Sequence, residues 1–69
     1  MSEEELDAME SVWLYLSEMT AAYLHEAAKA LEVKNYLQAD KAMIAAAFWG
    51  DSFESYNKYF KEMKKLYGR

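Results

Sequence analysis

The sequence predicts an all-α fold in which a long N-terminal helix packs against two shorter helices, as a helical hairpin or three-helix bundle. The chain has no proline and only two glycines among 69 residues, so few positions interrupt a helix. Its apolar residues recur at alternating spacings of three and four, the period of a helix packed along its length. The whole chain, residues 1–69, is expected to form one domain near the lower size limit for a self-sufficient core.

The first helix is expected over about residues 3–32. Ser2 can serve as its N-cap and Glu5 can reach back from the third helical position, which is the pattern of a capping box. An apolar stripe then follows the helix with a/d spacing, and this stripe is expected to face the rest of the fold. Its members are Leu6, Met9, Trp13, Leu16, Thr20, Tyr23, Ala27 and Ala30.

The second helix is expected over about residues 36–49. Asn35 tolerates a left-handed backbone and can also N-cap this helix, with Gln38 at the third helical position. The expected contacts lie on two adjacent lines of the helix. The first line is Leu37, Ile44 and Phe48, and beside it are Tyr36, Ala39, Met43 and Ala46.

Gly50 predicts the end of this helix. Glycine is favoured just beyond a helix C-terminus, where φ is usually positive. Asp51 could then N-cap a third helix over about residues 52–67, with Glu54 three residues later. The apolar stripe of that helix would be Phe53, Tyr56, Phe60, Met63 and Tyr67.

The stretch VWLYL, residues 12–16, is apolar on every side of the first helix. A first helix of about 30 residues would be about 45 Å long, twice the length of the other two, so its first half would protrude. We therefore expect this half to form a homo-oligomer interface, with two copies packed antiparallel about a two-fold axis. The alternative is that the helix bends and these residues close a monomeric core. The predicted interface residues are Leu6, Met9, Val12, Trp13, Leu14, Tyr15 and Leu16.

The net charge of −4 is unevenly distributed, with seven acidic and no basic residues in positions 1–26 and several lysines near the C-terminus. We interpret this as charges that complement the helix dipoles. Lys58, Lys61 and Lys65 are the candidates for electrostatic contact with a partner. Two alternatives follow: a nucleic-acid contact through this basic helix, or an acidic inhibitor that mimics nucleic-acid phosphates. The net negative charge disfavours direct binding to phosphate.

The sequence offers little that could support catalysis. It has no cysteine and one histidine, His25, which is expected on the surface. We therefore expect no metal site, no cofactor and no enzymatic activity. The longest apolar run, residues 42–49, is too short to cross a bilayer, and the acidic N-terminus does not resemble a signal peptide. These features predict a cytoplasmic protein without a membrane segment.

Two segments resemble known families. NYLQADKAMIAAAFWG, residues 35–50, is similar to the second helix of a tetratricopeptide repeat, although the preceding helix lacks that family's tryptophan, leucine and glycine pattern. AMIAAAFWGDSFESYNKYFKEM, residues 42–63, resembles the C-terminal part of small tail-assembly chaperones of long-tailed phages, where an alanine-rich helix meets a glycine turn. That resemblance implies binding to apolar helices of a tape-measure protein. Together with the composition, it predicts a small protein–protein interaction module, either a homodimer or a chaperone-like assembly adaptor.

Overall fold

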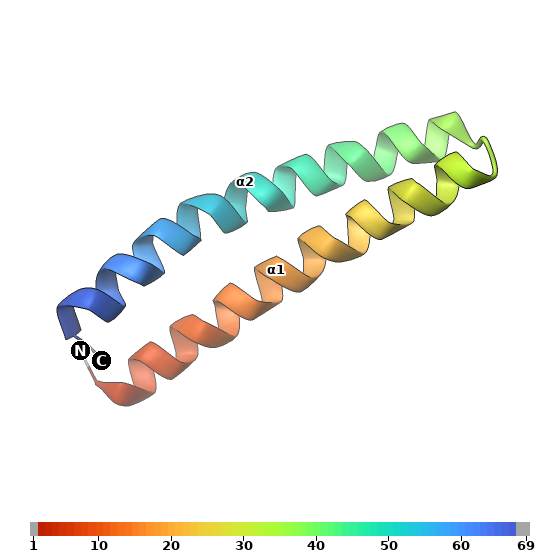
Figure 1. Cartoon of the computed structure of the whole chain (residues 1–69). Coiled ribbons are helices and arrows are strands. Elements are labelled where there is room, and N and C mark those ends of the chain that lie inside the picture. The colour runs from red at the N-terminus through yellow and green to blue at the C-terminus, as the bar shows by residue number, and fades with distance from the viewer. Residues whose placement is uncertain (1, 68–69) are drawn as a thin grey trace.

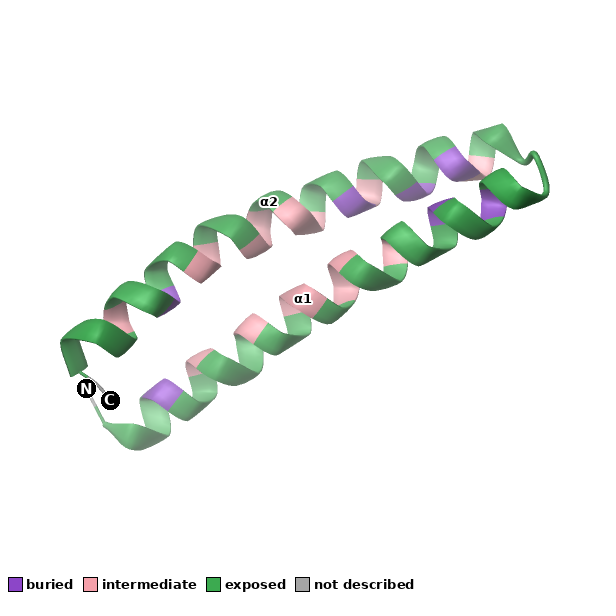
Figure 2. Cartoon of the chain, viewed as in Figure 1, coloured by how far each residue is buried: buried purple, intermediate pink, exposed green. Residues whose placement is uncertain are grey.

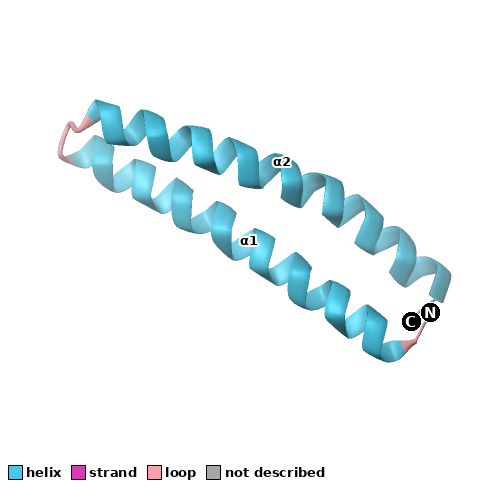
Figure 3. Ribbon diagram, turned by 180° about the vertical axis from the view of Figure 1, so that it is seen from behind, coloured by secondary structure: helices cyan, strands magenta, loops and turns pink. Residues whose placement is uncertain are grey.

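The computed structural model describes residues 2–67 and places them in two antiparallel helices (Figure 1). Helix α1 spans Glu3–Glu32 and helix α2 spans Tyr36–Tyr67. Figure 3 shows the same hairpin from behind, with both described ends of the chain at the end opposite the loop. The described part of the chain contains no strand, so the predicted all-α class is confirmed. The hairpin is elongated, with extents of 48 × 16 × 12 Å.

Helix α1 has the bounds and the cap that the sequence predicts. The backbone N–H of Glu5 donates to Ser2 Oγ at 3.2 Å, and the backbone N–H of Ser2 donates to Glu5 Oε1 at 3.4 Å. These two bonds complete the capping box and satisfy donors that the first turn leaves without intrahelical partners.

The loop between the helices is held by a Schellman-type pattern of backbone hydrogen bonds. The N–H of Asn35 donates to the carbonyl of Ala30 at 2.8 Å, and the N–H of Lys34 donates to the carbonyl of Leu31 at 3.0 Å. Lys34 takes the left-handed conformation, with φ of 59°, while Asn35 caps α2 by accepting from the Gln38 N–H at 3.2 Å. The predicted Asn35 cap is therefore confirmed, but the left-handed residue is its neighbour.

The predicted helix break at Gly50 is wrong. Gly50 and Asp51 lie inside α2, and no described glycine has a positive φ. Gly50 faces α1, where a Cβ at this position would come 3.6 Å from Thr20 Cγ2. A glycine costs a helix about 1 kcal/mol, whereas a break would remove several backbone hydrogen bonds and the packing of the residues beyond it. Packing along α1 therefore outweighs the local stop signal.

The expectation that α1 protrudes is also wrong, because it depended on that break. Uninterrupted, α2 has 32 residues and α1 has 30, so each helix covers the other along its whole length (Figure 1). Helix α1 therefore needs no kink, and neither half of it is left uncovered by α2.

The two helices meet along the stripe predicted for α1, every member of which is buried or half-buried (Figure 2). Alanines fill the half of the contact near the loop, while larger side chains fill the half near the termini. Figure 1 shows the helices close together at the loop and further apart toward the termini, as this difference in side-chain size requires. The buried residues are Leu6, Ala27, Ala30, Ala39, Ala42, Ala46 and Phe60.

Of the two contact lines predicted for the start of α2, the first is wrong, whereas in the second Ala39 and Ala46 are buried as predicted and Tyr36 and Met43 are exposed. Leu37, Ile44 and Phe48 are 68%, 72% and 67% exposed, whereas the alanines at positions 39, 42 and 46 are buried. Because the helices approach closely here, only small side chains fit between them, and the larger ones are turned outward.

Candidate interaction surface

Trp13, the second residue of the VWLYL stretch, packs inside the hairpin. Its ring lies 5.5 Å from the ring of Phe53 and 6.1 Å from that of Phe60, measured between centroids. Its Nε1–H donates to Asn57 Oδ1 at 2.7 Å, which satisfies the only polar group of the indole. Trp13 is therefore anchored to α2 by both its ring and its donor.

The other residues predicted for an intermolecular interface divide into two groups. Leu6 is buried, and Met9 and Leu16 are half-buried against α2. Val12, Leu14 and Tyr15 remain 43%, 47% and 54% exposed. The structure thus assigns the first group to the hairpin itself and leaves the second group available to another molecule.

The exposed group lies on two sides of the hairpin, because successive residues of a helix are about 100° apart. Tyr15 lies on the side where its ring meets the ring of Trp49 edge-on, at 5.9 Å, and Trp49 in turn meets Phe48 at 6.0 Å. Val12 and Met19, three and four residues from Tyr15, and Tyr59, eleven residues after Phe48, lie on the same side of their helices and extend this apolar surface. This surface, here the aromatic face, comprises Val12, Tyr15, Met19, Phe48, Trp49 and Tyr59.

The opposite side of the hairpin carries a second apolar surface. Leu14 lies there at spacings of ten and seventeen residues from Leu24 and Leu31, which keep it on the same side of α1. Met43 extends this side onto α2, since it is five residues before Phe48 of the aromatic face and so lies about 140° away from it around the helix. All four are exposed, and we name this surface, Leu14, Leu24, Leu31 and Met43, the aliphatic face.

Sequence reasoning missed most of these residues as surface features. The sequence pattern places Phe48 on the contact line of a short second helix, and it does not single out Leu24 or Leu31 as surface residues. The signal that could have identified them is the alanine content of α2: a helix that presents alanines inward at 39, 42 and 46 must present its large residues outward.

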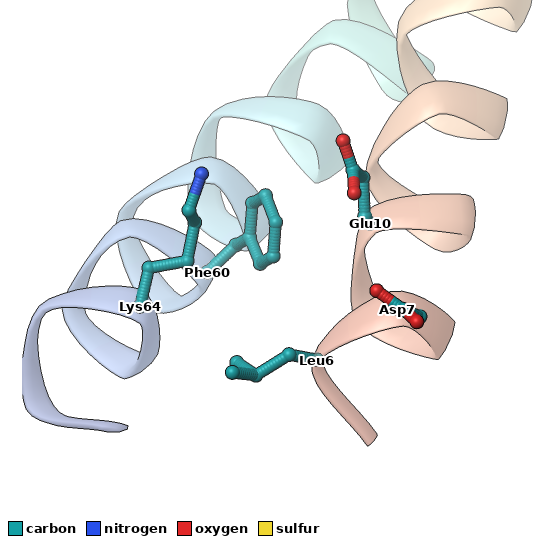
Figure 4. A pocket seen from close by; sticks show the side chains of 5 residues that line it. All are labelled: Leu6, Asp7, Glu10, Phe60 and Lys64. Carbon is teal, nitrogen blue, oxygen red and sulfur yellow. The ribbon is translucent and has the colours of Figure 1, made fainter. Parts of the chain in front are cut away.

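A shallow pocket lies at the open end of the hairpin, where the helices diverge (Figure 4). It is lined by Leu6, Asp7, Glu10, Phe60 and Lys64. Lys64 Nζ lies 5.5 Å from the centroid of the Phe60 ring, a cation–π distance. The acidic side chains come from α1 and the basic one from α2, so the pocket has opposite charges on its two walls. Nothing in it pairs a nucleophile with a base.

The lysines predicted for electrostatic contact, Lys58, Lys61 and Lys65, are all exposed on the C-terminal half of α2. Lys58 lies 3.9 Å from Glu54 in an exposed pair one turn apart, which contributes little to stability. Phe53 and Phe60 face α1 and cannot stack on nucleotide bases. A nucleic-acid contact here would thus rest on phosphate contacts alone.

Tyr56 is half-buried on α2, next to Tyr59 of the same helix. Burial against α1 raises the pKa of Tyr56 above its ordinary value of 10.0, and the neighbouring Tyr59, whose ring centroid is 6.2 Å away, raises it further. The raised pKa of Tyr56 therefore concerns stability at alkaline pH.

Within residues 2–67, no group of three or more histidine, cysteine or acidic side chains is placed to hold a metal ion. His25 is exposed on α1. Over the same residues, neither helix is apolar enough over a sufficient length to cross a bilayer.

Comparison of the chain with protein-family models, curated proteins and solved structures finds no match in any of the three.

Proposed function

We propose that this chain is a non-enzymatic protein–protein interaction module, a helical hairpin whose exposed apolar faces are covered by helices of other polypeptides. One observation carries this proposal: the residues buried within the hairpin are mostly alanines, whereas fourteen large apolar side chains among residues 2–67 are exposed. Scattered exposed apolar residues are ordinary, but contiguous faces of them mark binding surfaces.

The surface area supports the same conclusion. The chain exposes 5171 Å², whereas the relation between surface and mass for folded monomers gives about 4,500 Å² for a protein of this mass. The excess of about 700 Å² reflects the elongated shape and the thin contact between two helices. Each large side chain that a partner covers would contribute roughly 1.5–3 kcal/mol before the entropy of association is counted.

Two separate faces suit an adaptor, because one can bind a second copy while the other binds a different helix. This is the role expected of a chaperone-like assembly factor. The similarity to phage tail-assembly chaperones would supply such a partner, an apolar helix of a tape-measure protein. That similarity now rests on the helical sequence of residues 42–63 alone, since no glycine turn is formed at Gly50.

The proposal is tested by two measurements on the purified chain. We expect either a thermal midpoint that rises between about 2 and 200 µM protein, as association with itself requires, or a constant midpoint with binding of an apolar-surface dye such as anilinonaphthalene sulfonate. The first result places a second copy on the faces, and the second leaves them open for another protein. A constant midpoint without dye binding would contradict the proposal, because the faces would then not be available.

A further inference from the structure

The hairpin exposes more surface than a folded monomer of its mass, and the difference is close to the area that a second copy would cover. A standard interface buries about 800 Å² on each partner. The chain exposes 5171 Å², about 700 Å² more than a folded monomer of its mass. Covering one face of each hairpin would therefore bring the area that each chain exposes close to the value for a folded monomer of its mass.

The aromatic face has its largest side chains near the middle of the molecule. Tyr15 is near the centre of α1, and Phe48 and Trp49 are near the centre of α2. Tyrosine and tryptophan at the centre of a surface are typical of residues that dominate binding energy. A two-fold axis through this centre would pack each aromatic cluster against its own copy.

Charged residues at the two ends of α2 on this face have opposite signs. Lys41 is one heptad before Phe48, and Glu62 is two heptads after it, so all three lie on the same side of the helix. Within one chain the two charges are about 31 Å apart at the usual helical rise, and within the described residues neither has an ion-pair partner. A second α2 packed antiparallel would bring Glu62 of each copy to Lys41 of the other.

Helix α1 repeats this arrangement. Lys29 is two heptads after Tyr15, and Glu5 is one heptad before Val12, so both lie at the ends of the aromatic face. Antiparallel packing of α1 on its copy would bring Glu5 to Lys29. Each helix therefore supplies two complementary pairs to one dimer.

A single axis can satisfy both helices. The midpoint of the α2 pair falls between residues 51 and 52, and the midpoint of the α1 pair is Ser17. The contacts of Trp13 with Asn57 and of Thr20 with Gly50 place residue 18 of α1 level with residue 52 of α2. The two midpoints thus lie within about one or two residues of each other, about 3 Å along the axis.

We propose that the occupant of the aromatic face is a second copy of this chain, packed antiparallel about a two-fold axis to give a four-helix bundle with the loops at opposite ends. This inference rests on the proposed function and names its partner. The aliphatic face, on the other side of each hairpin, remains free in this dimer. The other arrangement, with both loops at one end, would place Lys29 of one copy near Lys41 of the other and is disfavoured by charge.

The test measures mass by sedimentation equilibrium. The wild-type chain is expected to have twice its mass of 8.1 kDa at tens of micromolar. Phe48→Glu is expected to give a folded monomer, because Phe48 is exposed in the hairpin, while Leu14→Glu, a matched change on the aliphatic face, leaves the dimer intact. Far-UV circular dichroism confirms that both variants keep their helices.

Charge reversal tests the antiparallel arrangement. Lys41→Glu and Glu62→Lys each create two like-charged pairs, and each is expected to weaken dimerisation about tenfold at low salt, while the double variant restores it. Because the two residues cannot meet within one chain, rescue by the double variant reports contact between copies. Single variants that dimerise as the wild type does, or a double variant no better than the singles, would overturn the arrangement.

A monomeric wild-type chain at 100 µM would overturn the dimer itself. Its binding of anilinonaphthalene sulfonate then separates the two proposals. A monomer that binds the dye keeps its faces open for a different protein, so only the identity of the partner is refuted. A monomer that does not bind it refutes the interaction module as well.

Discussion

Gly50→Ala should stabilise the protein, although a sequence-based assignment of Gly50 to a helix end predicts the opposite. Gly50 lies in the middle of α2 with an ordinary helical backbone. A Cβ there meets Thr20 Cγ2 at 3.6 Å, an ordinary van der Waals contact that requires no movement. Alanine is favoured over glycine in a helix interior by about 1 kcal/mol, and the half-buried methyl adds a few tenths.

The expected gain of about 1 kcal/mol corresponds to a rise of about 4–8 °C in the thermal midpoint of a domain of this size. The assay is thermal or urea unfolding followed by circular dichroism at 222 nm, at one fixed protein concentration. Ala47→Gly is the matched control, since position 47 is exposed and also lies in the middle of α2; it should lose about the same amount. A loss of stability in Gly50→Ala would refute a continuous α2, because only a positive φ or a tight contact at residue 50 would produce it.

Phe60→Ala should lower the free energy of unfolding in urea by about 2–4 kcal/mol, because Phe60 is buried at the end of the hairpin. Ile44→Ala, at an exposed site, should change it by less than about 0.5 kcal/mol. Equal effects of the two changes would contradict the burial of Phe60. Lys34→Gly should raise the free energy of unfolding by about 1 kcal/mol, because the left-handed conformation at φ of 59° is sterically unfavourable for lysine but not for glycine. A decrease in the same assay would argue against the left-handed loop. The raised pKa of Tyr56 means that the folded state holds this proton more tightly than the unfolded state, so stability should be intact below pH 10.0 and fall as the pH rises from there through the folded pKa. Phe at position 56 should reduce that fall and remove the latest step of the ultraviolet tyrosine titration; an unchanged titration would count against the shift.

The sequence predicts α1 well because its signals agree with one another. The capping box at Ser2 and the a/d stripe from Leu6 to Ala30 describe the same helix and the same inward face, and both are confirmed. The Asn35 cap was likewise predictable from its side chain, which accepts from the Gln38 N–H. Where local propensity and long-range packing point to the same structure, the pattern alone is sufficient.

The length and the inward face of α2 were not predictable in this way, because local and long-range signals conflict there. Gly50 and Asp51 favour a stop and a new start, but the contact of Gly50 with Thr20 depends on the partner helix and is absent from any local window. The large residues Leu37, Ile44 and Phe48 also form a regular apolar line, which usually indicates a core. Their exposure follows from the alanines at 39, 42 and 46, which bring the helices too close for larger side chains.

The candidate interaction surface was predictable in part. Val12, Leu14 and Tyr15 were identified as apolar residues beyond the needs of one helix face, and they are exposed in the hairpin. Trp13 and Leu16 were grouped with them, but α2 extends far enough to cover both. The partition between core and surface depended on the length of α2, and so on the single misassigned glycine.

The most direct test of the account is a chemical cross-link between two copies. The chain has no cysteine, so Lys41→Cys and Glu62→Cys each carry a single thiol on the aromatic face. With a short bis-maleimide, an equimolar mixture of the two variants is predicted to give a covalent dimer, while each variant alone stays largely monomeric, because an antiparallel pair brings residue 41 of one copy to residue 62 of the other. Efficient cross-linking of either variant with itself, or none in the mixture, would contradict the antiparallel dimer.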